Sequence, residues 1–138
     1  MSVGTRMYRE QHDHLRALSQ ELERHLHDDL RDGAAARLAV SRLAGALQVH
    51  LAMEDESLYP SLVVHPNAEL RERARRLRDD LSGLRSALGG YLRRWPTHLA
   101  IEREPPAFAA ETRALLERLA KRIALEDEEL FALADALP

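Results

Sequence analysis

The chain has 138 residues and a formal net charge of -3, and 45% of its residues are hydrophobic while only 4% are aromatic. This length suits a single domain over residues 1–138 with one core, and the small net charge argues against a nucleic-acid surface or an acidic tail. The chain has no cysteine, which excludes disulfides, thiolate zinc sites and cysteine nucleophiles.

The N-terminal segment, residues 1–10, carries charges and lacks the apolar centre of a signal peptide. No run in the chain approaches the length of an apolar membrane span, so we expect a soluble cytoplasmic protein. A first helix is predicted over residues 5–31, and Asp32-Gly33 is expected to end it with glycine just past the last turn. Its apolar stripe at three- and four-residue steps is Leu15, Leu18, Leu22, Leu26 and Leu30.

A second helix is predicted over residues 34–59, with Pro60 as its stop. His50 and Glu54 fall inside its apolar stripe, which consists of Val40, Leu43, Leu47, Leu51 and Leu58.

After a short loop, a third helix is predicted over residues 67–93, and Gly89-Gly90 is expected to bend or fray its end. A longer connection, which contains several prolines, leads to a fourth helix over residues 108–136 with Glu126 near its centre. The third helix has the apolar seam Leu77, Leu81, Leu84, Leu88 and Tyr91, and the fourth has Leu115, Leu119, Ile123, Leu130 and Leu137.

The two halves of the chain resemble each other. Residues 50–59 read HLAMEDESLY and residues 122–131 read RIALEDEELF, and residues 12–18 also resemble residues 81–88. Long amphipathic helices with this repeat predict an all-α fold, an up-down-up-down four-helix bundle with an internal pseudo-twofold repeat. Equivalent positions of the two halves would then surround one central cavity.

Glu54 and Glu126 occupy equivalent positions of this repeat, each within an apolar stripe. A carboxylate that faces a core is costly unless another group pairs with it. His50 lies one helical turn before Glu54 and therefore shares its face. An imidazole and carboxylates that converge from several helices can hold a metal ion. The alternative is a buried ion-pair network that includes Arg122.

The sequence resembles the hemerythrin-like domains, also called HHE cation-binding domains. The motifs that carry the resemblance are Glu10–Arg16, His50–Pro60 and Glu126–Phe131. The resemblance implies a four-helix bundle with two metal ions at its centre. Each half would supply one histidine from its first helix and a His-x-x-x-Glu pair from its second. Activities in the family include dioxygen binding, iron handling, and sensing or detoxifying reactive oxygen and nitrogen species.

Carried over residue by residue, the family pattern places metal ligands in the first half at His12, His50 and Glu54. His12 fits the pattern better than His14, which remains an alternative. The second half departs from the pattern, since its two histidine positions are Leu81 and Arg122.

In the second half only Glu126 is retained. Asp55 and Asp127 are expected to belong to a solvated acidic face, and ligation of the metal is the alternative for them.

An arginine in place of a histidine changes the chemistry of the second half. A guanidinium stays protonated and has no lone pair, so Arg122 cannot bind a cation and would repel one. It can instead neutralise Glu54 and Glu126 as a replacement for the second metal. Two outcomes stay open: one iron or zinc ion held by His12, His50, Glu54 and Glu126, or a metal-free core.

Three functions follow from these outcomes. The first is a divergent hemerythrin-like protein with a degraded two-metal centre, which binds or senses metal, oxygen or redox species. The second is a metal-free helical interaction or regulatory module, working as a homodimer or with a protein partner. The third is a redox enzyme acting on peroxide or nitric oxide. Dioxygen or nitric oxide would bind only with a metal present, and neither nucleic acid nor a membrane is expected as a partner.

Overall fold

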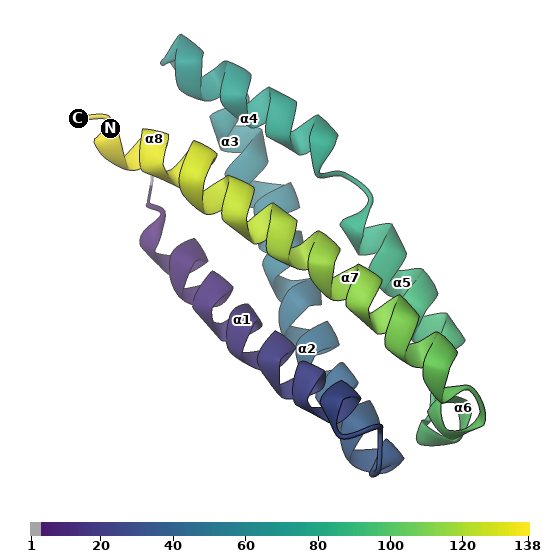
Figure 1. The fold of residues 1–138 in the computed structure, drawn as a ribbon. Helices are drawn as coiled ribbons and strands as arrows, with labels where there is room; N and C mark the ends of the chain where they lie inside the picture. Colours follow the sequence, from purple (N-terminus) through teal and green to yellow (C-terminus); the bar gives the residue numbers. More distant parts are fainter. Residues whose placement is uncertain (1–3) are drawn as a thin grey trace.

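The computed structural model describes residues 4–138, so the first three residues of the predicted domain and of the N-terminal segment 1–10 lie outside the described part. Every regular element in the described part is a helix, which confirms the predicted all-α class. The long helices lie side by side (Figure 1). The start and the end of the described chain are close together, and the Thr5 hydroxyl donates to the Asp135 carboxylate there.

The first two helices are α1 (Arg6–His27) and α2 (Gly33–Met53). The prediction that Asp32-Gly33 ends the first helix was wrong. α1 ends earlier, and Asp29 and Leu30 then take left-handed backbone angles, with φ of 56° and 55°. Asp32 caps the start of α2 instead, because its side chain accepts a hydrogen bond from the Ala35 N–H.

The helix that begins with α2 continues past the predicted stop at Pro60. A π-helical turn, η1 (Glu54–Leu58), follows α2, and α3 (Tyr59–Leu62) follows η1. The Tyr59 N–H donates to the Glu54 carbonyl, five residues back. Proline breaks an α-helix through its missing N–H and its clash with the carbonyl four residues before it. The altered hydrogen-bond spacing of the π turn lets Pro60 continue the helix.

The C-terminal helix repeats this pattern. α7 (Pro105–Leu125) leads into a second π-helical turn, η2 (Glu126–Phe131), and α8 (Ala132–Ala136) completes it. Each π turn therefore begins at one of the two carboxylates that the sequence repeat singled out.

The predicted third helix is interrupted. α4 (Ala68–Asp80) and α5 (Leu84–Arg94) are separated at Gly83, whose φ of 96° is readily adopted only by glycine. A bend or frayed end was expected at Gly89-Gly90, which instead lie inside α5. A short helix, α6 (His98–Arg103), fills the connection to α7.

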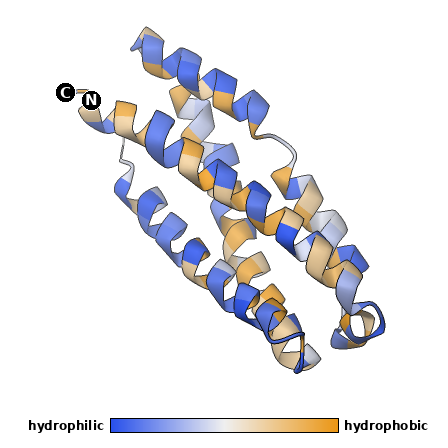
Figure 2. Cartoon of the chain, in the orientation of Figure 1, coloured by the Kyte–Doolittle hydropathy of each residue, from blue (hydrophilic) through white to orange (hydrophobic). Residues whose placement is uncertain are grey.

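Buried apolar side chains form two clusters, one on each side of a polar layer. Along α1, His12 lies between Tyr8 in one cluster and Leu15 in the other. Glu54 and Glu126 occupy the corresponding places in their own helices. Hydrophobic faces turn toward neighbouring helices, and hydrophilic residues cover the outside (Figure 2). Of the predicted stripe residues, those only partly buried are Leu18, Leu30 and Leu137.

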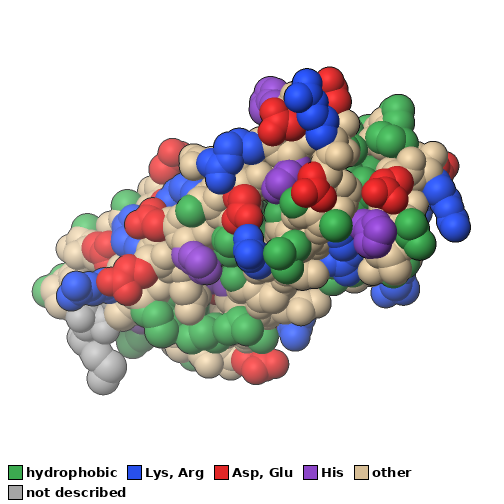
Figure 3. Space-filling model, turned by 90° about the horizontal axis from the view of Figure 1, so that it is seen from below, with side chains coloured by type: hydrophobic (Ala, Val, Ile, Leu, Met, Phe, Trp, Pro, Cys, Tyr) green, Lys and Arg blue, Asp and Glu red, His purple; other side chains and the backbone are tan. Residues whose placement is uncertain are grey.

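The outer surface mixes charges of both signs. On the face drawn in Figure 3, basic and acidic side chains are interspersed. Among residues 4–138, no helix combines the length and the apolar character needed to cross a membrane.

Candidate metal centre

Four buried side chains meet in the polar layer between the two apolar clusters. His12 comes from α1, His50 from the last turn of α2, and Glu54 and Glu126 from the starts of the two π turns. One nitrogen or oxygen atom of each residue lies within 4.8 Å of the corresponding atoms of the others. Four helical segments thus deliver two imidazoles and two carboxylates to one point.

Both imidazoles present Nε2 to this point. His50 Nε2 lies 3.0 Å and His12 Nε2 lies 3.7 Å from Glu54 Oε2, and His12 Nε2 lies 3.1 Å from Glu126 Oε1. Each Nδ1 is held by an acceptor outside the cluster: Asp127 Oδ1 at 2.7 Å from His12 and Gln11 Oε1 at 2.6 Å from His50. Because these acceptors require Nδ1–H, they orient each ring and leave Nε2 for the centre.

Arg122 lies on the opposite side of the two carboxylates and is only 6% exposed. Its Nη2 donates to Glu54 Oε1 at 2.8 Å, and its Nε lies 3.4 Å from Glu126 Oε2. Tyr59 donates its hydroxyl to Glu126 Oε2 at 2.8 Å. Each carboxylate therefore has one oxygen on the histidine side and the other on the arginine side.

Burial and the charges of neighbouring groups shift the pKa values of the residues in this layer. Burial opposes ionisation of Glu54, but the His12 and His50 imidazoles close to its Oε2 hold the pKa of Glu54 well below its usual range. Burial and the nearby Glu54 charge raise the pKa of Glu126 to about 7. Burial disfavours the imidazolium of His12, yet the Glu126 and Glu54 carboxylates outweigh it and raise the pKa of His12 to about 10.

Burial also opposes the charge of Arg122, but Glu126 and Glu54 raise the pKa of this guanidinium above its already high value. At neutral pH the metal-free layer therefore contains an imidazolium, a guanidinium and an ionised Glu54.

The remaining residues singled out from the sequence lie outside the four-residue cluster. His14 is exposed on α1. Asp55 is exposed, 3.7 Å from Arg122 Nη2 and 3.6 Å from Arg85 Nη1. Asp127 orients His12 from outside the cluster. Leu81 is buried beside Arg122, whose Nη1 donates to the Leu81 carbonyl at 3.4 Å.

Two contributors were missed from the sequence. Tyr59 was not among the candidate site residues, and its hydrogen bond to Glu126 was not anticipated. Gln11, next to His12 in the quoted motif, was assigned no role, although its side chain accepts from His50. The position of Gln11 next to His12 indicates that Gln11 lies near the site. No spacing rule, however, connects Gln11 to a histidine on another helix.

The donor set fits one metal ion. Glu54 Oε2 is buried and lacks a hydrogen bond of good geometry, although both Nε2 atoms approach it. Two imidazole nitrogens and two carboxylate oxygens are ligands that zinc and ferrous iron accept. The arginine side does not fit a second ion, because Arg122 offers no lone pair.

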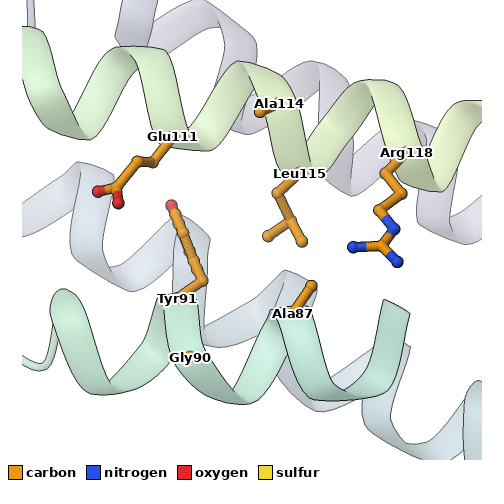
Figure 4. A pocket seen from close by; sticks show the side chains of 7 residues that line it. All are labelled: Ala87, Gly90, Tyr91, Glu111, Ala114, Leu115 and Arg118. Carbon is orange, nitrogen blue, oxygen red and sulfur yellow. The ribbon is translucent and has the colours of Figure 1, made fainter. Parts of the chain in front are cut away.

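The surface cavity in Figure 4 is separate from this centre. It has a volume of about 270 Å³ and lies between α5 and α7, where Tyr91, Glu111 and Leu115 are among its lining residues. None of the four cluster residues lines it.

A scan against protein-family models matches the hemerythrin HHE cation-binding domain over residues 3–134, nearly the whole chain. No curated protein and no solved structure matches the sequence. The buried His/Glu cluster agrees with the cation-binding description of that family model. The chain therefore belongs to the hemerythrin HHE cation-binding domain family.

Proposed function

We propose that this protein holds a single divalent metal ion, iron or zinc, in a centre that has lost its second metal position. The ligands would be His12 Nε2, His50 Nε2, Glu54 Oε2 and Glu126 Oε1. The observation that carries the proposal is the convergence of these four buried groups within 4.8 Å, with both imidazoles oriented through Nδ1.

In this proposal Arg122 takes the place of the second metal ion. Its contacts with Glu54 Oε1 and Glu126 Oε2 support this role, because a cation between the two carboxylates would make similar contacts. We further propose that the helices form an up-down-up-down four-helix bundle with approximate twofold symmetry. The two π turns, which begin at equivalent glutamates, support that symmetry.

The proposed activity is binding or sensing of a small redox-active ligand, with dioxygen and nitric oxide as candidates. A bound iron would supply a redox-active Lewis acid. The chain's own contribution is to exclude water with the apolar clusters on each side of the polar layer and to orient the imidazoles through Asp127 and Gln11. The Tyr59 hydroxyl donates a hydrogen bond to Glu126 Oε2. Burial and the charges of Glu126 and Glu54 raise the pKa of Tyr59, so the phenol stays protonated.

Metal content tests the proposal directly. Protein purified from cells supplied with iron, zinc and manganese is expected to contain about one metal ion per chain by elemental analysis. His12→Ala should weaken metal binding by more than about 100-fold, since even groups that only orient ligands contribute roughly 10–100-fold. His14→Ala removes an exposed histidine from the same helix and should leave binding unchanged.

Other results of this measurement favour different functions. Folded protein that stays metal-free under every supply would favour the regulatory module. Stoichiometric iron together with peroxide turnover would favour the enzyme. Equal effects of His12→Ala and His14→Ala would contradict the assigned ligands.

Metal affinity should rise with pH. The raised pKa of His12, about 10, means that its Nε2 carries a proton at neutral pH, which a metal ion must displace. Lower pH therefore favours the proton and higher pH favours the metal, by about tenfold per pH unit for each displaced proton. Competition with a chelator at pH 6, 7 and 8 measures this. An affinity that does not change with pH over this range would contradict metal binding through His12.

A further inference from the structure

A second cavity lies on the arginine side of the polar layer. Its volume is about 140 Å³. We call it the arginine cavity, and its lining residues are Asp55, Tyr59, Arg78, Leu81, Ser82, Gly83, Arg85 and Arg122. Neither His12 nor His50 lines it, so it is separate from the proposed metal ligands.

Arginine side chains outnumber carboxylates in the lining of the arginine cavity. Arg78, Arg85 and Arg122 contribute three guanidinium groups, and Asp55 is the one carboxylate in the lining. Asp55 lies 3.6 Å from Arg85 and 3.7 Å from Arg122, beyond good hydrogen-bond distance. Arg78 makes its ion pair, with Asp79, through Nε. The Nη groups of Arg78 and Arg85 are therefore available to a ligand in the cavity, whereas Arg122 already donates from Nη2 to Glu54 and from Nη1 to the Leu81 carbonyl.

The backbone adds to this positive character. Gly83 lines the cavity and precedes the first turn of α5. No side chain caps this helix start. The free N–H groups of a first turn and the helix dipole both favour an anion there.

The size of the cavity limits its ligand. At roughly 30 Å³ per water, the volume corresponds to about four to five water molecules. Such a space admits a small oxyanion and is too small for a nucleotide. We propose that the arginine cavity binds a small oxyanion of the phosphate or sulfate type, with Arg122 at its floor and Arg78 and Arg85 at its mouth. The proposal does not depend on a metal ion, because the cavity is formed by other residues.

Titration with inorganic phosphate tests the proposal. The full chain, with and without chelator treatment, would be titrated by calorimetry at constant ionic strength. We expect saturable binding of one phosphate per chain, with a dissociation constant on the order of 1 mM because two of the arginines are exposed. Arg78→Gln and Arg85→Gln should each weaken binding by roughly fivefold or more, through the loss of charge-assisted hydrogen bonds.

Matched controls separate the cavity from general surface charge. Arg75→Gln on α4 and Arg93→Gln on α5 remove the same charge from exposed positions outside the cavity, and each should change the affinity by less than about twofold. Phenyl phosphate distinguishes a free anion from a phosphate ester: binding comparable to phosphate means that the cavity also takes the end of an ester, and weaker binding means that it takes the free anion.

Asp55→Asn provides a gain-of-binding test that misfolding cannot imitate. Removing the competing carboxylate should tighten phosphate binding by roughly threefold or more, because Arg85 and Arg122 lose their charged neighbour. Three results would each overturn the proposal: no saturation with phosphate, equal losses in the control variants, or an unchanged affinity in Asp55→Asn. Failure here leaves the metal proposal intact, since metal content is measured separately.

Discussion

Replacing Arg122 by alanine is expected to lower the free energy of unfolding of the metal-free protein by roughly 3 kcal/mol or more. Arg122 is buried against Glu54 and Glu126, and Glu54 stays ionised at neutral pH because its pKa is held low. The substitution removes one of the two cations beside the carboxylates and leaves only the His12 imidazolium to balance them. Removing one partner of a buried ion pair costs several kcal/mol. Urea denaturation at neutral pH, after removal of metal, measures the change.

Arg113→Ala is the matched control for this substitution. Arg113 is exposed on the same helix, so its loss should change stability by no more than about 0.5 kcal/mol. A similarly small effect of Arg122→Ala would mean that Arg122 does not neutralise the carboxylates. Its aliphatic chain would then lie along apolar surface while its guanidinium reaches solvent.

Restoring both imidazoles of the second half is expected to raise the metal content from about one ion per chain toward two. Leu81→His and Arg122→His together remove the fixed cation and add two ligands at the positions where the family pattern has histidine. Leu81 is only 8% exposed and lies beside Arg122, so a histidine there would face the arginine side of the carboxylates. Elemental analysis and metal titration of the double variant measure the gain.

One of the two single variants serves as the control for the double variant. Leu81→His alone should gain no metal, because the remaining guanidinium repels a cation. A double variant that folds but binds no additional ion would count against the equivalence of the two halves. The helix break at Gly83, close to Leu81, is the feature most able to disturb that equivalence.

The helices could be predicted from the sequence because their apolar residues recur at helical spacing, and nearly all of the predicted stripe residues are buried. Several boundaries were wrong for local reasons. Asp32 suits the end of one helix and the start of the next, and only the backbone angles of Asp29 and Leu30 decide between them. Pro60 was assigned as a stop because sequence rules assume α-helical hydrogen bonding.

Much of the candidate site was also visible in the sequence. Glu54 and Glu126 stand out because a carboxylate within an apolar stripe needs a partner, and the repeat identifies Arg122 as that partner. Gln11 and Tyr59 could not be found this way. Their roles depend on how one helix is rotated against another, and a single helix's periodicity carries no such information.

The two π turns restrict the insertions and deletions that this chain can accept near its centre. In an α-helix, which turns about 100° per residue, Tyr59 would point roughly 140° away from Glu54. The wider turn brings both side chains to the same centre, where the phenol meets Glu126. The number of residues between glutamate and aromatic ring, rather than their identity, thus sets where that ring points. Loss of a single residue between the glutamate and the aromatic residue of either π turn would rotate the rest of the helix. A different side chain would then point to the centre.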